Sequence, residues 1–316
     1  MNRGRYKKSN RRKRRIKSAI IISVAVLITL FIIFLAVGLS LSEKKKGYDD
    51  DDLDFDREET EGRETRDVPN VSAYPLPLLE DGTTFSSRLA NIKEGATSVC
   101  ISLNDPDGTL LYRSAIASSF TYLSLKSDAS SISTYVNAIS DEELYATAIL
   151  YIPTFNKSEN DLISDVELSI WGSVACEAIR AGIGDVLLVA SDASEEDVER
   201  LCALADRIHI TEESAIIGLC LPSSVLEAEK SVSLIDQLAG TFDYLAFDAT
   251  SIGGEGTLVE NTEQAIADMQ LQLMFYKMRV LLPRCSSTEE LDTLANIVTK
   301  HSVSSWQAVT INPEQQ

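Results

Sequence analysis

The sequence predicts a (β/α)8 TIM-type barrel in residues 71–316, preceded by one transmembrane helix and a disordered acidic stalk. Three observations lead to this class. The composition changes abruptly near residues 17, 42 and 70. In the last part, short apolar runs alternate with longer amphipathic segments, which is the pattern of parallel strands joined by helices. That part is 246 residues long, and barrels of this class typically have about 250 residues.

The first 42 residues predict a membrane anchor. Residues 1–17 contain ten Lys or Arg and no acidic residue, and residues 18–42 contain no charged residue. An apolar helix of about 20 residues spans the hydrocarbon core, and basic residues before it keep that end in the cytoplasm. A cleaved signal peptide is the alternative, although its apolar region is typically only about 7–15 residues. We therefore expect a single-pass protein of the cell membrane, with lipid around residues 18–42 and an extracytoplasmic C-terminal domain.

Residues 43–70 predict a disordered linker, because they are rich in acidic residues and have too few apolar ones to form a core. The domain that follows carries 13 Lys and Arg against 36 Asp and Glu, a net charge of −23. A surface of this charge repels phosphate backbones, so we expect no nucleic-acid partner. The basic residues at the N-terminus are explained by membrane orientation and anionic lipid.

Eight short apolar segments are the expected barrel strands. Continuous runs rich in β-branched residues are typical of parallel strands buried on both faces. Seven are clear, at residues 97–103, 146–152, 185–190, 215–221, 244–247, 278–282 and 306–311. An eighth, residues 70–76, comes first, with a helix over 86–95. Because Pro75 and Pro77 weaken this first strand, a seven-stranded open or incomplete barrel is the alternative.

Amphipathic helices are expected between the strands. In residues 194–208, apolar residues recur at helical spacing and form one buried face. In residues 287–300, Ser287 and Glu290 match a capping box. The remaining helices are expected over residues 129–140, 170–182, 224–239 and 262–276.

The cysteines and histidines do not suggest a metal site. The five cysteines are Cys100, Cys176, Cys202, Cys220 and Cys285. They form no CxxC pair and are interpreted as buried thiols, with a Cys176–Cys202 disulfide as the alternative. His209 and His301 fall near helix ends that lead into the next strand, which is the stability face of a barrel. We expect no metal and no cofactor.

The candidate site lies where strands end, because barrels of this class carry their active sites on the loops after the strands. Asp105 and Asp248 are the predicted catalytic pair, since both follow strands and glycoside hydrolysis requires two carboxylates. Asp107 and Asp192 are also explained as turn or cap residues. The predicted ligand-binding residues are Asn104, Asp107, Tyr112, Phe155, Asp192 and Arg284.

Residues 103–114, LNDPDGTLLYRS, resemble a segment of the glycoside-hydrolase-type TIM barrels found behind a membrane anchor in many bacteria. In that family the second strand ends in Lys-Asp or a variant of it, followed by an acidic glycine turn and Tyr-x-Ser. The matching places are occupied by Asp105, Asp107, Gly108, Tyr112 and Ser114. Phe155 matches an aromatic residue after the third strand, and the resemblance extends over most of residues 71–316. It implies a barrel of glycosidase ancestry.

The fourth predicted strand departs from that family. There the strand ends in an aromatic-Asp-Tyr-x-Arg signature that supplies an acid, whereas this chain has residues 187–190, LLVA, and no acid before Asp192. The departure predicts a non-catalytic barrel that binds a glycan or a cell-envelope protein. Two alternatives stay open: an active glycoside hydrolase that uses Asp105 and Asp248, and a structural envelope protein. The sequence leaves open whether the protein is an enzyme.

Overall fold

The computed structural model describes residues 66–78, 82–90, 92, 96–117, 123–126, 129–153, 165–190, 197–221, 231–250 and 255–309. The expected anchor in residues 18–42 and most of the expected linker therefore lie outside the described residues, and those expectations stay predictions. Among the described helices, none combines the length and the apolar character that crossing a membrane requires.

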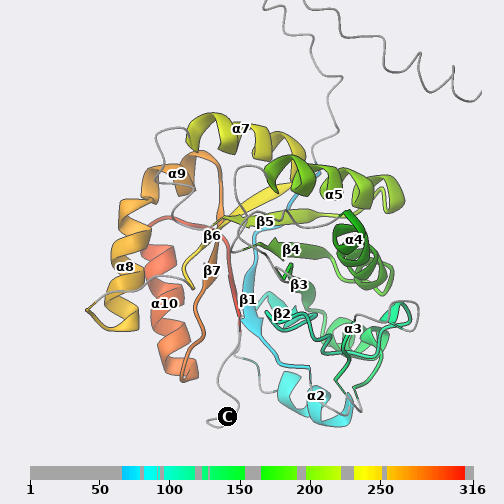
Figure 1. Cartoon of the computed structure of the whole chain (residues 1–316). Helices are drawn as coiled ribbons and strands as arrows, with labels where there is room; N and C mark the ends of the chain where they lie inside the picture. The colour runs from blue at the N-terminus through cyan, green and yellow to red at the C-terminus, as the bar shows by residue number, and fades with distance from the viewer. Residues whose placement is uncertain are drawn as a thin grey trace, which may run out of the picture. The chain divides into compact units, whose positions relative to one another are not determined.

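Eight parallel strands close into a barrel, and helices surround it (Figure 1). The strands are β1 (Ser72–Pro75), β2 (Ser98–Ser102), β3 (Tyr145–Tyr151), β4 (Asp185–Val189), β5 (Ile217–Leu221), β6 (Tyr244–Asp248), β7 (Arg279–Leu282) and β8 (Trp306–Ala308). Each strand pairs in parallel with the next, and β1 also pairs with β8. The predicted α/β barrel is confirmed.

The first strand forms in spite of its prolines, so the open or incomplete barrel is wrong. Pro75 is the last residue of β1 and is in register with Cys100. The ladder continues past it, because the backbone N–H of Leu76 donates to the carbonyl oxygen of Cys100 at 2.9 Å. A proline at the end of a strand removes one donor there and leaves the rest of the pairing intact.

The described helices are α2 (Gly82–Leu89), α3 (Ile132–Asp141), α4 (Asp165–Arg180), α5 (Val198–Thr211), α7 (Ser231–Thr241), α8 (Leu258–Asp268), α9 (Gln270–Phe275) and α10 (Thr288–Lys300). The helix expected over residues 262–276 is two helices that meet at Met269. The complete capping box lies at the start of α8, between Thr257 and Glu260. At the start of α10, the Ser287 hydroxyl oxygen accepts from the N–H of Glu290. The capping box is incomplete, because the Glu290 carboxylate accepts from the N–H of Ser286 and not from that of Ser287.

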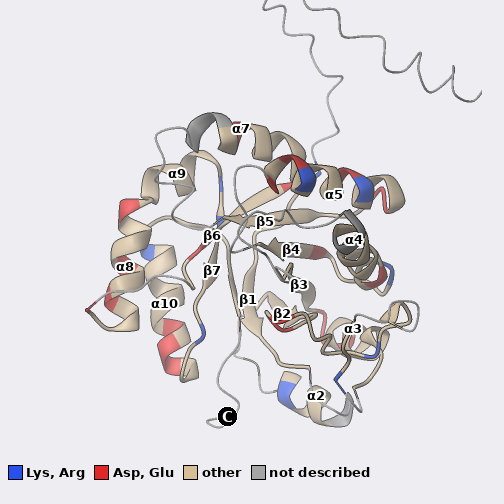
Figure 2. Cartoon of the chain, viewed as in Figure 1, with Lys and Arg blue, Asp and Glu red and all other residues tan. Residues whose placement is uncertain are grey.

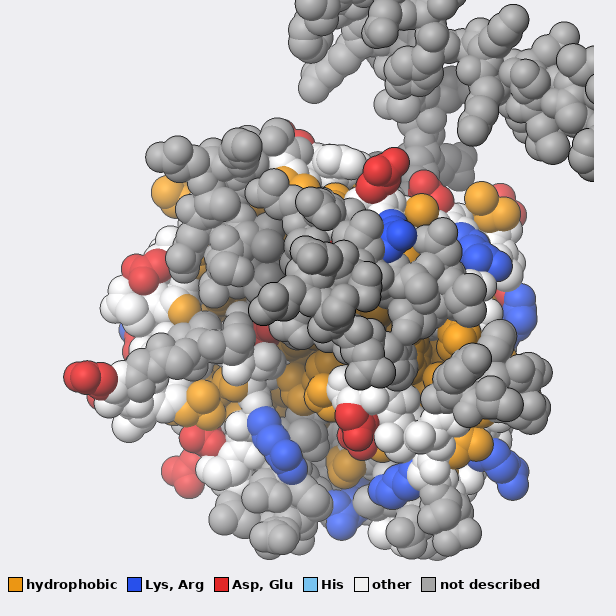
Figure 3. All heavy atoms as spheres, in the orientation of Figure 1, with side chains coloured by type: hydrophobic (Ala, Val, Ile, Leu, Met, Phe, Trp, Pro, Cys, Tyr) orange, Lys and Arg blue, Asp and Glu red, His pale blue; other side chains and the backbone are white. Residues whose placement is uncertain are grey.

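The helical layer carries much of the acidic charge, with acidic residues on α5, α8 and α10 (Figure 2). On the face seen in Figure 3, hydrophobic side chains gather near the centre, and acidic and basic ones lie around them.

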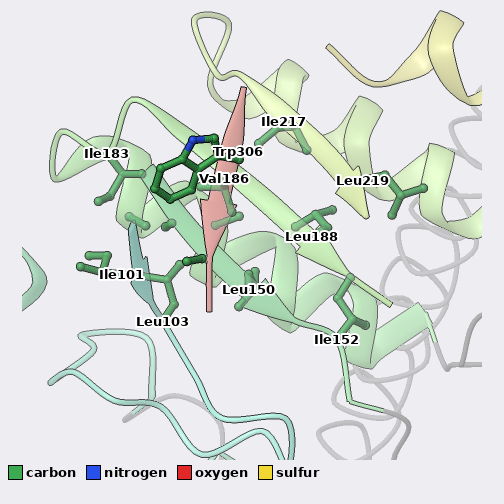
Figure 4. Close-up of a cluster of buried hydrophobic side chains, with 14 of the residues drawn as sticks. Ile101, Leu103, Leu150, Ile152, Ile183, Val186, Leu188, Ile217, Leu219 and Trp306 are labelled. Carbon is green, nitrogen blue, oxygen red and sulfur yellow. The ribbon is translucent and has the colours of Figure 1, made fainter. Parts of the chain in front are cut away.

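Two apolar cores flank the strands. Outward-facing strand residues such as Ile101, Leu150, Leu188 and Leu219 pack with the helices (Figure 4). The other core lies inside the barrel and includes Cys100 and Cys220. All five cysteines are free thiols, so the disulfide alternative is not realised.

A polar cluster fills the end of the barrel where the strands begin. Nη1 and Nη2 of Arg279 donate to the two carboxylate oxygens of Asp185 at 3.0 and 3.2 Å. The Tyr244 hydroxyl donates to Asp185 at 2.8 Å, and the guanidinium carbon of Arg279 lies 3.8 Å from the centroid of the Tyr244 ring. The Tyr244 ring needs a glycine beside it, because a Cβ on Gly218 would lie 2.2 Å from Cζ. This end of the barrel is closed.

Candidate functional site

The opposite end, where the strands finish, forms the barrel mouth. The strand register brings alternate strands to one level, as in other barrels of this class. The uppermost such layer consists of Ser102 on β2, Val189 on β4, Asp248 on β6 and Val309 after β8. Strands β2 and β6 are four positions apart in the barrel order and therefore face each other. Asp248 is the carboxylate of this layer.

Asp248 is nearly inaccessible, with 2% of its surface exposed. Its Oδ1 accepts hydrogen bonds from the backbone N–H of Thr250 at 2.7 Å and from the Thr250 hydroxyl at 2.5 Å. No described residue donates to Oδ2. One oxygen therefore holds the start of the β6–α8 connection, and the other has no hydrogen-bond donor among the described residues.

Tyr151 lies within electrostatic reach of both predicted catalytic carboxylates. It is the last residue of β3 and is partly buried. Burial raises the pKa of its hydroxyl, and Cys100, Cys220, Asp248 and Asp105 raise the pKa further. Both aspartates are therefore close enough to the Tyr151 hydroxyl to act on it electrostatically. The structure brings Asp105 and Asp248 to the same mouth, as the sequence predicts.

Asp105 stands at the start of a tight turn. The N–H of Gly108 donates to the carbonyl oxygen of Asp105 at 2.9 Å, and the N–H of Asp105 donates to the carbonyl oxygen of Thr109 at 2.9 Å. Gly108 has a φ of 92°, which favours glycine. Asp107 accepts from the N–H of Thr109 at 3.1 Å, so its carboxylate stabilises the turn.

The electrostatic surroundings of Asp105 identify its neighbours. Burial raises the pKa of this carboxyl, and the charge of Asp107 raises it further. Lys126 and Arg284 act in the opposite direction. Arg284 follows β7, so the structure brings this predicted ligand-binding residue towards Asp105.

Two predicted ligand-binding residues have structural partners. Asn104 is fully buried, and its amide donates to the Tyr151 carbonyl oxygen at 2.8 Å while its Oδ1 accepts from the Tyr151 N–H at 2.9 Å. Its side chain thus extends the β2–β3 ladder. Tyr112 is also fully buried, and its hydroxyl donates to Glu177 on α4 at 2.7 Å. Neither side chain is exposed at the mouth.

Glu177 was missed by sequence reasoning, although it organises the β2–α3 connection. Besides Tyr112, it accepts from the Ser114 hydroxyl at 2.5 Å and from the Ala115 N–H at 2.7 Å. The sequence did offer a signal, because Glu177 is a lone acidic residue between the apolar residues Cys176 and Ala178. The Tyr-x-Ser motif therefore anchors this loop to α4.

The remaining predicted residues, Phe155 and Asp192, lie outside the described residues. On β4, Val189 and Ala190 are buried and occupy the mouth end of the strand, where the resembling family has its acid. The one acid of β4 is Asp185, at the other end of the strand. In the part of the chain that the structure describes, His, Cys, Asp and Glu form no group of three suited to a metal ion.

No family model matches the sequence, and no curated protein matches it. The fold is similar to solved barrels at low identity. A β-mannanase of Thermomonospora fusca in complex with mannotriose is 12% identical, with 76% of this chain and 78% of that chain covered and a TM-score of 0.49. A D-allulose 3-epimerase of Methylomonas sp. is 12% identical, covers 77% and 85%, and has a TM-score of 0.44. An aldolase, QR15, is 13% identical, covers 75% and 88%, and has a TM-score of 0.41.

Proposed function

We propose that the barrel is a glycosidase-like domain that binds a glycan at its mouth without cleaving it. The observation that carries this proposal is the uppermost inward layer, in which Asp248 is accompanied by Ser102, Val189 and Val309. Hydrolysis of a glycosidic bond generally uses two carboxylates that flank it, about 5–9.5 Å apart according to mechanism. A valine on β4 supplies neither a proton nor a nucleophile.

The residues around this layer suit sugar binding, because Tyr151 at the end of β3 packs against the inner core beside it. Tyr151 offers an aromatic ring, Ser102 a hydroxyl, and Asp248 an unused carboxylate oxygen. Binding sites for small molecules commonly combine an apolar or aromatic wall with a few convergent polar groups that fix orientation. A neutral glycan also avoids the repulsion that the net charge of the domain imposes on anionic polymers.

An active glycoside hydrolase is the second candidate, and the raised pKa of Asp105 favours it. A general acid needs a pKa above that of an ordinary carboxyl group, so that it holds its proton near neutral pH. Asp105 would protonate the leaving oxygen, and Asp248 on the facing strand would act as the base or nucleophile. Asp105 is exposed and its neighbours lie on a turn, which makes this arrangement looser than that of a formed site.

The deciding experiment measures binding and cleavage together. The purified full-length chain is incubated with a panel of cell-wall and storage glycans, and both bound glycan and released reducing ends are quantified. The non-catalytic proposal expects saturable binding without reducing-end release, and loss of binding in Asp248→Asn. Asp141→Asn is the matched control, because Asp141 is exposed at the end of α3, which leads into the start of β3, and it carries the same charge away from the mouth.

Each outcome separates the candidates. Turnover that disappears in both Asp248→Asn and Asp105→Asn would replace the binding proposal by the hydrolase. Neither binding nor turnover, from a chain whose circular dichroism shows a folded barrel, would contradict both and leave the structural envelope role or an envelope-protein ligand.

The membrane location is part of the same proposal and has its own test. The charge pattern around residues 18–42 supports an anchor with the barrel outside the cell. We expect the full-length chain in the membrane fraction, with the barrel digested by protease added to intact cells after the wall is removed. A chain that lacks residues 1–42 and still sediments with membranes would contradict the anchor.

A further inference from the structure

A second concave site lies on the outer side of the barrel, between α4, α5 and the β2–α3 connection. The cavity has a volume of about 520 Å³, which falls within the range of about 300–1,000 Å³ typical of small-molecule sites. The lining residues that matter for its chemistry are Ile116, Ser173, Cys176, Arg180, Arg207 and Thr211. None of them belongs to the barrel mouth.

The walls of this cavity are held in place by specific contacts. Glu177 fixes the β2–α3 connection to α4 through Tyr112, Ser114 and the N–H of Ala115. On the other side, α4 and α5 approach closely at Gly172, where a Cβ would lie 2.9 Å from Leu204. The cavity is therefore formed by elements whose positions are fixed before a ligand arrives, which lowers the entropic cost of binding.

Two guanidinium groups line the cavity, and none of its lining residues is acidic. Nε of Arg180 lies 2.5 Å from Glu212, so its terminal nitrogens remain as donors. Within the described residues, the side chain of Arg207 has no carboxylate partner. Paired guanidinium donors bind carboxylate or phosphate oxygens with bidentate geometry.

The hydroxyl groups of the cavity offer acceptors. The Ser173 hydroxyl donates to the carbonyl oxygen of Ser169 at 2.9 Å, and the Thr211 hydroxyl donates to that of Arg207 at 2.8 Å. Each hydroxyl proton is thus used within its own helix, while the oxygen lone pairs stay free. A ligand that fits these oxygens must bring hydrogen-bond donors of its own.

The remaining surface is neutral. Ile116 and Ile208 are apolar, and burial raises the pKa of the Cys176 thiol, with Glu212 raising it further while Arg180, Arg207 and a backbone hydrogen bond oppose. The thiol is therefore protonated at neutral pH and forms part of the apolar wall.

We propose that this cavity binds a small hydroxylated organic anion, such as a sugar acid or a sugar phosphate. The anionic group contacts Arg180 and Arg207, and ligand hydroxyls donate to Ser173 and Thr211. This site is independent of the glycan proposed for the mouth, because the two share no residue.

The test is calorimetric titration of the full-length chain with glucuronate, glucose 6-phosphate and neutral glucose. We expect the two anions to bind saturably and glucose to bind at least about tenfold more weakly. Arg207→Gln should weaken binding of the anions about tenfold or more, because it removes charge-assisted hydrogen bonds. Arg113→Gln is the matched control: Arg113 is also exposed, lies outside the cavity and loses the same charge.

Two further variants make the result decisive. Asp248→Asn should leave anion binding unchanged, so failure at this cavity is distinguishable from failure at the mouth. Ser173→Phe, which fills the cavity without changing charge, should abolish binding. The proposal is overturned if neither anion binds, if Arg207→Gln and Arg113→Gln weaken binding equally, or if glucose binds as tightly as the anions.

Discussion

Asp185 and Asp248 are two carboxylates inside one barrel, and they differ in how completely their neighbours satisfy them. Asp185 is fully buried and accepts from Arg279 and Tyr244, with both oxygens used. Asp248 is equally hidden, but its described partners come from Thr250 alone and occupy one oxygen. Both oxygens of Asp185 are used within the fold, whereas Oδ2 of Asp248 has no donor among the described residues.

This difference agrees with the general pattern of such barrels, in which residues where the strands begin stabilise the fold and residues where the strands end form the active site. A buried ion pair is costly to form, because both ions lose their hydration, and it is costly to break for the same reason. The position of each acid along its strand therefore indicates its role better than its residue type does.

The largest expected effect comes from breaking the buried pair. Asp185→Asn leaves Arg279 buried without a compensating charge, and we expect a loss of about 3–5 kcal/mol in the free energy of unfolding. Asp248→Asn keeps an oxygen for Thr250 and should cost no more than about 1 kcal/mol. Chemical denaturation followed by the fluorescence of the buried Trp171 and Trp306 measures both.

A double variant sharpens this comparison. Replacing both partners, as in Asp185→Leu with Arg279→Met, removes the unpaired charge together with its counterion, so we expect a smaller loss than Asp185→Asn alone. Equal destabilisation by Asp185→Asn and Asp248→Asn would show that the two carboxylates do not differ in the way their contacts indicate.

The sequence predicts the barrel well, because strand burial and helix amphipathicity are local patterns. Each of the runs from 97–103 to 306–311 overlaps an observed strand, and β3 and β6 each extend one residue beyond the predicted run. The sequence does not predict the Asp185–Arg279 pair, because the two residues are 94 positions apart and meet only when the barrel closes. The sequence also misses the break at Met269 between α8 and α9, because the amphipathic pattern of residues 262–276 runs across it.

The candidate site is predicted only in part. The position of Asp105 and Asp248 at strand ends follows from the order of elements. The roles of Asn104 and Tyr112 do not, since each depends on a partner far along the chain, the Tyr151 backbone and Glu177 respectively. Tyr151 was missed because a tyrosine at the end of an apolar run does not reveal on which side of the strand it lies.

Two glycines test how tightly the closed end is packed. A Cβ on Gly218 would lie 2.2 Å from the Tyr244 ring, which the Asp185 hydrogen bond and Arg279 hold in place. We expect Gly218→Ala to destabilise the fold by about 1–3 kcal/mol through overpacking. Gly240 in α7 has nothing within 4 Å of its Cβ position, so Gly240→Ala should gain up to about 1 kcal/mol.

Thermal unfolding of the two alanine variants measures this contrast directly. If Gly218→Ala leaves the unfolding temperature unchanged, Tyr244 moves aside at little cost. The closed end is then more adaptable than its hydrogen bonds indicate. Recovery of stability in Gly218→Ala combined with Tyr244→Leu would attribute the loss to the ring itself.

The smallest expected effect is at the mouth, where Asp105 titrates. Burial and Asp107 raise the pKa of Asp105. A carboxyl whose pKa is higher in the folded than in the unfolded state stabilises the fold as the pH falls through the folded pKa, and that stabilisation is lost as the pH rises. At neutral pH, Asp105→Asn should therefore stabilise the protein, by no more than about 0.5 kcal/mol because the site is exposed and screened.

The gain should disappear on acidification below the usual carboxyl pKa of about 3.9, where Asp105 is uncharged in both states. It should also shrink in an Asp107→Asn background, because part of the pKa shift comes from that charge. Urea denaturation at several pH values measures it. A gain that persists unchanged in acid would show that packing, and not titration, distinguishes Asp105, and would remove the property that favours it as a general acid.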